Sequence, residues 1–140
     1  MKKIIVSVIA FGLLIVSTVF AFTPFASRYI TAYDTFLVDK GSGKIEIWFD
    51  VTGTTRMDEI GAQKIELKEK RDDGWKTVAT YNYTDVEHSH ILTTNKTIYS
   101  DYVEYFGTVG KEYYAIVTVW ASKSGSGDSR KIDSQAIILE

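Results

Sequence analysis

The stretch GKEYYAIVTVWA, from Gly110 to Ala121, decides the fold class of this chain. Its residues fall into two series that alternate with a period of two, which is the pattern of a β-strand. The series expected to face the core is Tyr113, Ala115, Val117, Val119 and Ala121. The series expected on the opposite face is Tyr114, Ile116, Thr118 and Trp120. Because large side chains occupy both series, the stretch predicts a strand with a core on one face and an aromatic surface on the other.

The same alternation occurs earlier in the chain. In KIEIWFDVTG, residues 44–53, the side chains expected to face the core are Ile45, Ile47, Phe49 and Val51. Trp48 falls in the outward series of that strand, so it raises the same question as Trp120. In KIELKEKR, residues 64–71, Ile65 and Leu67 are expected inward. Asp72-Asp73-Gly74 then predicts a hairpin turn.

About seven strands are expected between turn signals, at residues 31–39, 44–53, 64–71, 75–83, 97–107, 111–122 and 132–139. Thr55 and Gly61 are expected to bound a single helical turn. We interpret residues 85–96 as a long loop with room for a short strand at Ile91-Leu92, and residues 123–131 as a flexible connection. Without βαβ alternation, the pattern predicts an all-β fold. The architecture expected for residues 33–140 is a single antiparallel β-sandwich of the immunoglobulin or fibronectin type III kind.

The first residues are typical of a signal peptide. Lys2 and Lys3 precede an uncharged apolar run over residues 4–20. Val19 and Ala21 place small residues at the −3 and −1 positions of a cleavage site, so we expect cleavage after Ala21. The alternative is an uncleaved anchor, because the 17-residue run is at the lower limit of a membrane span. The domain is expected outside the cell in either case, and residues 22–32 would be a tether or a short first strand.

Charge and cysteine content narrow the function classes. Removal of residues 1–21 would leave 14 basic and 18 acidic residues, a net charge of −4. That balance argues against a nucleic-acid partner, which requires a basic patch. The chain contains no cysteine, which favours an exported bacterial protein large enough to fold without disulfides.

Candidate catalytic and metal sites are weak. His88 and His90 in EHSH are two residues apart, but a zinc site needs three or four ligands, and the chain has no other histidine. Whether this loop binds a metal stays open. Ser129 in GSGDS lacks the strand-to-helix context of a nucleophile elbow. We therefore expect no catalytic residue, no metal and no cofactor, and we predict that the protein is not an enzyme.

Two resemblances add to this interpretation. Tyr113 and the series after it resemble the sixth strand of a fibronectin type III domain, where the leading tyrosine makes the tyrosine corner. That resemblance implies a bond from Tyr113 back to the backbone near Thr108 to Gly110. Residues 57–134, with MDEIG, IELKEK and VEYFGTVGKEYYAIVTVWA, are similar to small secreted proteins of unknown function from Gram-positive bacteria. This second resemblance implies export and a bacterial source.

The outward series of the opening strand is the candidate site. Tyr114, Ile116 and Trp120 could stack on a sugar or anchor a protein partner. Alternatively, aliphatic stems of neighbouring lysines or the tether could cover them. We predict a non-catalytic binding module at the cell surface or outside the cell, with cell-wall glycan or another protein as partner. The alternative is a secreted antibacterial or signalling effector that acts on another cell. The oligomeric state stays open.

Overall fold

The computed structural model describes residues 27–140, so the predicted signal peptide and residues 22–26 of the predicted tether lie outside the described residues. The strands are β1 (Ile30–Asp39), β2 (Lys44–Arg71), β3 (Gly74–Asn82), β4 (Leu92–Phe106), β5 (Glu112–Lys123), β6 (Ser126–Asp133) and β7 (Ile137–Ile138). A 3₁₀-helix, η1 (Val86–Ile91), connects β3 to β4. The predicted all-β fold with antiparallel pairing is confirmed.

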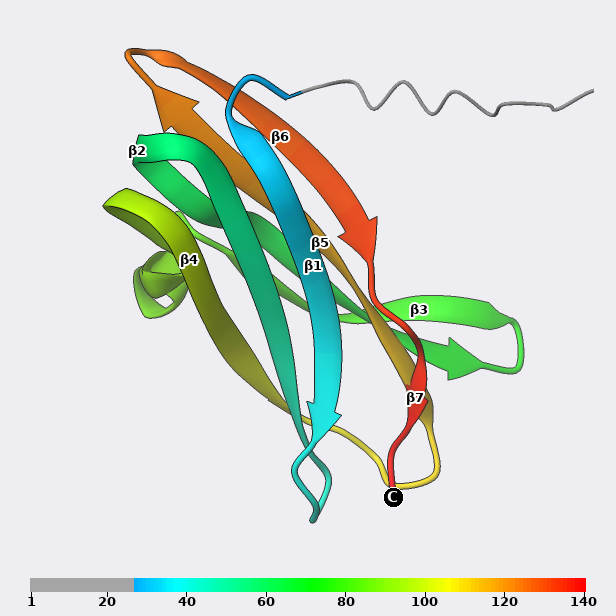
Figure 1. Ribbon diagram of the computed structural model, residues 1–140. Coiled ribbons are helices and arrows are strands. Elements are labelled where there is room, and N and C mark those ends of the chain that lie inside the picture. The colour runs from blue at the N-terminus through cyan, green and yellow to red at the C-terminus, as the bar shows by residue number, and fades with distance from the viewer. Residues whose placement is uncertain (1–26) are drawn as a thin grey trace, which may run out of the picture.

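The long strand β2 organises the sheet. Its first part, Lys44–Thr52, pairs with β1 on one side and with β4 on the other. Its second part pairs with β5 over Glu59–Glu69, and its other edge pairs first with β4 and then with β3, as far as Arg71. All seven strands therefore belong to one sheet, which curls into a half-barrel (Figure 1). We call β1 with the paired parts of β2 and β4 the first half-sheet, and β3, β5 and β6 with the rest of β2 the second half-sheet.

The prediction of a helical turn at Thr55–Gly61 is wrong, because β2 continues through this segment and bends there. The register of β2 against β4 shifts between Thr52 and Met57, so the strand changes direction without leaving the sheet. Gly53 makes room for the fully buried Met57, because a Cβ at residue 53 would lie 2.5 Å from Met57 Cγ. Pairing with β4 and β5 keeps this segment extended against its local capping signal.

The core lies inside the curl of the sheet. The predicted inward positions are confirmed and fully buried: Ile45, Ile47, Phe49, Val51, Ile65, Leu67, Tyr113, Ala115, Val117, Val119 and Ala121. Met57, Ile60, Ile91 and Leu139 complete the packing from the bend, η1 and the C-terminal segment. Burial of this apolar surface is the main favourable term for the fold.

Two connections differ from the prediction. Residues 85–96 form η1 and the start of β4, where Leu92 pairs with Gly61. The predicted flexible connection after β5 is a tight hairpin, because Ser124 and Gly125 both have positive φ, at 53° and 80°. β6 therefore begins at Ser126, inside the segment interpreted as flexible.

Aspartates lie on both outer strands of the first half-sheet. Asp34 Oδ1 accepts the backbone N–H of Thr35 on β1 at 2.8 Å, and Asp101 Oδ1 accepts that of Tyr102 on β4 at 2.8 Å. Charged side chains on edge strands discourage edge-to-edge association. Among residues 27–140, the one helix is too short to cross a membrane.

Candidate functional site

The predicted site on β5 lies on the outer face of the second half-sheet, where its side chains are half-buried. Tyr114 meets the Trp75 ring edge-on, with centroids 4.7 Å apart. The Trp120 indole N–H points to Glu59 Oε1 at 3.4 Å, and its ring lies against β6, since a Cβ at Gly127 would be 2.3 Å from it. The two large aromatics of this face are thus each engaged by neighbouring strands.

The surroundings of this face carry charges of both signs, because Glu66 and Asp133 lie on either side of Ile116 among the lysines. The register places Lys68 opposite Tyr114, and Lys64 and Lys131 on either side of Thr118. Lys70 lies over the Trp75 ring at 6.0 Å. Of the acidic neighbours, Glu66 is held by Lys64 at 2.9 Å, and the hydrogen bond from Lys64 lowers the pKa of Glu66.

Tyr113, on the core face of the same strand, is fully buried and has two hydrogen-bond partners. Its hydroxyl accepts the backbone N–H of Thr108 at 2.8 Å, within the segment that the fibronectin resemblance indicates. It donates to Glu69 Oε2 at 2.8 Å, and Arg71 Nε donates to the other oxygen of that carboxylate at 3.1 Å. Burial opposes ionisation of Glu69, but the bonds from Tyr113 and Arg71 outweigh it and lower its pKa. Burial raises the pKa of Tyr113.

A second aromatic surface lies on the outer face of the first half-sheet. Phe36, Trp48 and Tyr102 stand directly opposite one another on β1, β2 and β4, and we call them the aromatic row. The Phe36 and Trp48 rings are parallel within 2°, with centroids 6.2 Å apart. The Trp48 and Tyr102 rings are stacked at 4.5 Å. Phe36 is 40% exposed, and the other two are half-buried.

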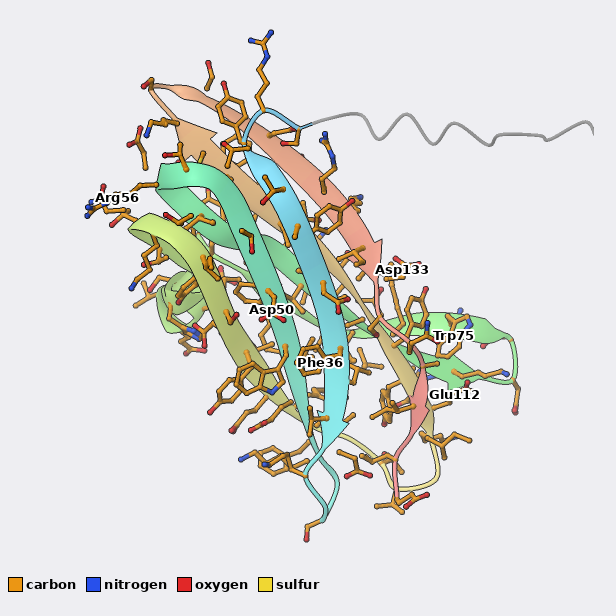
Figure 2. All side chains as sticks on the ribbon, in the orientation of Figure 1. Phe36, Asp50, Arg56, Trp75, Glu112 and Asp133 are labelled. Carbon is orange, nitrogen blue, oxygen red and sulfur yellow. The ribbon has the colours of Figure 1, made fainter. Side chains whose placement is uncertain are left out.

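Acidic side chains flank the aromatic row. One neighbouring row across the strands is Asp34, Asp50 and Ser100, and the other is Val38, Glu46 and Glu104. Figure 2 shows Phe36 and Asp50 on the first half-sheet and Trp75 out on β3. Glu46 accepts the Trp48 indole N–H at 3.1 Å, and Lys44 pairs with Glu104 at 2.8 Å. The row therefore combines apolar ring surface with carboxylate oxygens.

An open hollow of about 360 Å³, which we call the cavity, lies beside the aromatic row, between η1 and β4. Its lining residues are Tyr81, His88, His90, Asp101, Tyr102, Val103 and Glu104. Both histidines that the sequence singled out are therefore in one place, and the cavity shares Tyr102 with the row.

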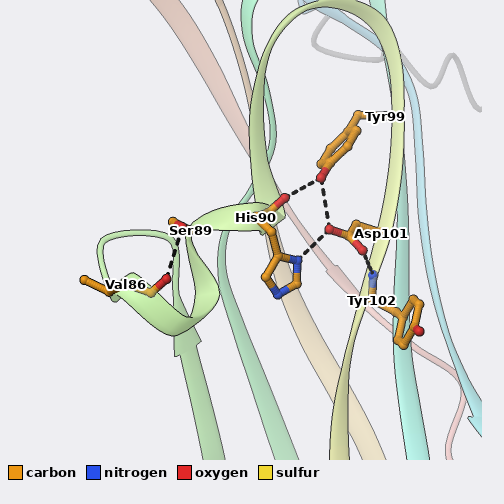
Figure 3. A network of polar contacts seen from close by, with 6 residues as sticks. All are labelled: Val86, Ser89, His90, Tyr99, Asp101 and Tyr102. Atoms are coloured by element: carbon orange, nitrogen blue, oxygen red, sulfur yellow. Dashed lines mark hydrogen bonds and ion pairs between the residues drawn. The ribbon is translucent and has the colours of Figure 1, made fainter.

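A polar network fixes the His90 side of the cavity (Figure 3). Asp101 Oδ2 binds His90 Nδ1 at 2.6 Å and accepts the Tyr99 hydroxyl at 2.9 Å. The Tyr99 hydroxyl also approaches the His90 carbonyl oxygen. Burial, with the bond to Asp101, raises the pKa of Tyr99 to about 12. Burial likewise raises the pKa of Tyr81 to about 12.

The other wall of the cavity is aromatic. The Tyr81 ring meets the His88 ring edge-on, with centroids 4.9 Å apart, and the Tyr81 hydroxyl donates to the Glu104 carbonyl at 2.9 Å. In the part of the chain that the structure describes, no group of three or more histidine, cysteine or acidic side chains could hold a metal ion.

Sequence reasoning noted Trp48 as outward and both histidines, but it missed Phe36, Tyr102, Tyr99 and Asp101. Phe36 and Tyr102 lie in strands that were predicted, and only the strand register brings them to Trp48. A scan against protein-family models finds no match for this chain, and a search of curated proteins finds no relative.

Proposed function

We propose that this chain is an exported, non-catalytic binding module that holds a cell-wall glycan through the aromatic row. The observation that carries the proposal is the row itself, three aromatic side chains aligned across three strands and flanked by carboxylates. The leader-like residues 1–21 support export. We propose also that the chain is related to secreted proteins of Gram-positive bacteria and that its architecture is immunoglobulin-like.

The chemistry of a glycan suits this surface. A sugar ring has an apolar C–H face, which packs against aromatic side chains. Its rim of hydroxyl groups can donate hydrogen bonds to carboxylates. Neighbouring strands are about 4.8 Å apart, so a row across three strands extends over roughly 10 Å. That length exceeds one sugar ring and favours a polymer. A protein partner is the alternative occupant of the same row.

The test is a pelleting experiment with isolated Gram-positive cell walls. We expect the purified protein to sediment with the walls, Trp48→Ala and Phe36→Ala to stay in solution, and Trp120→Ala to sediment. Phe36 lies on an outer strand and is exposed, so its removal should leave the fold intact, which thermal unfolding can check. Ile138→Ser is the matched control, because Ile138 is an exposed apolar side chain on β7.

Two outcomes would contradict the proposal. Loss of sedimentation only in Trp120→Ala would move the site to the face of Tyr114, Ile116 and Trp120. Failure of the unmodified protein to sediment would remove the wall glycan as its partner.

A further inference from the structure

We infer that the cavity between η1 and β4 is a second binding site, which takes a single hydroxyl-bearing sugar ring through the imidazole of His90. The inference rests on the proposed function, because the cavity adjoins the aromatic row at Tyr102 and would hold one ring of the same glycan.

His90 is held in place at two points. Asp101 fixes its ring at 2.6 Å, and Tyr99 holds its backbone carbonyl. Asp101 also accepts the Tyr99 hydroxyl and the backbone N–H of Tyr102, so three donors surround this carboxylate. Asp101 is thus a positioning residue. A ring that is oriented before the ligand arrives loses less freedom on binding.

The second ring nitrogen of His90 is the group that a ligand would meet. The bond to the carboxylate places the proton of the neutral ring on Nδ1, which leaves Nε2 as an acceptor. Figure 3 shows this nitrogen directed away from Asp101. His90 lines the cavity, and its side chain is 48% exposed, so a ligand can reach it.

The remaining walls match a sugar better than a metal or an anion. Tyr81 and His88 supply aromatic surface, and Glu104 also lines the cavity, with one carboxylate oxygen paired with Lys44. A metal would need a third ligand, which the described residues do not provide. An anion would face the carboxylates of Asp101 and Glu104. The volume of about 360 Å³ is at the small end of the roughly 300–1,000 Å³ typical of small-molecule sites, which suits one ring.

The experiment is an NMR titration of the two histidine rings with the trisaccharide of N-acetylglucosamine. We expect the ring signals of His88 and His90 to shift, and His90→Ala to weaken the affinity by about tenfold, which corresponds to one lost hydrogen bond to a ligand. Asp101→Asn should change the nitrogen shifts of His90 before ligand is added, because the tautomer is no longer fixed. Ser89→Ala is the matched control, since Ser89 lies on η1 but does not line the cavity.

The outcomes separate this inference from the proposed function. Shifts of the histidine ring signals that depend on His90 support sugar binding in the cavity, whether or not the protein sediments with walls. Sedimentation without any histidine shift would overturn the inference and leave the proposed function standing. Equal affinity in His90→Ala and the unmodified protein would also overturn it.

Discussion

The two half-sheets both carry aromatic side chains on their outer faces, but they use them differently. On the second half-sheet, Tyr114 contacts Trp75, and Trp120 contacts Glu59 and Gly127. Lysines and carboxylates both lie between these contacts. On the first half-sheet, Trp48 stacks with aromatic rings on both neighbouring strands. Acidic side chains lie on both sides of this aromatic row.

The difference teaches that alternation along one strand does not locate a binding face. Trp120 and Trp48 have the same outward position in their strands, yet Trp48 gains two ring partners because Phe36 and Tyr102 lie directly opposite. Register across strands therefore decides whether outward aromatics form a continuous surface.

The largest effect is expected on β5, whose two faces should differ sharply. Tyr113→Phe should lower the free energy of unfolding by about 1–3 kcal/mol, because it removes a donor to the buried Glu69 and an acceptor for Thr108. Tyr114→Phe should change it by less than about 0.5 kcal/mol. Urea unfolding of both variants measures the difference. Equal losses would mean that the outer face of β5 contributes to the fold as much as its core face.

A smaller effect is expected within the aromatic row. A double-mutant cycle on Trp48 and Tyr102 should give a coupling energy of about 0.5–1.5 kcal/mol, because their rings stack. The matched pair Trp48 and Trp120 lies on different half-sheets and should be additive within about 0.5 kcal/mol. A coupling near zero for the first pair would show that the row is an alignment without mutual stabilisation.

The smallest effect is expected at alkaline pH, beside the row. Burial raises the pKa values of Tyr81 and Tyr99 to about 12, above their ordinary value of 10.0. Their contribution to stability is therefore fully present below pH 10 and is lost as the pH rises toward 12. Spectrophotometric titration should show these tyrosines ionising last, and Tyr81→Phe should remove one of the late steps. A single step near pH 10 would contradict their burial.

Local pattern was sufficient for much of the fold. Ile45, Phe49 and Leu67 face the core as their alternation predicts, because the period of a strand depends only on the strand itself. The hairpin at Asp72-Asp73-Gly74 is likewise confirmed, with Gly74 at φ +119°.

Long-range pairing accounts for what the sequence did not reveal. The segment around Met57 carries capping signals, yet its hydrogen bonds go to β4 and β5, which are distant in sequence. Long-range pairing also explains why the candidate site could not be predicted. His90 was visible as a possible ligand, but Asp101 joins it only because β4 runs back past η1.

The shared strand β2 has a consequence for how the molecule unfolds. It pairs with β1, β3, β4 and β5, so each half-sheet lacks a central strand without it. Neither half can lose its order while the other keeps all its hydrogen bonds, which favours a single cooperative transition. Most of these pairings join residues far apart in the chain, a topology associated with slow folding. Backbone amides of β2 should accordingly be among the last to exchange with solvent, and a nick at its bend would release both halves together.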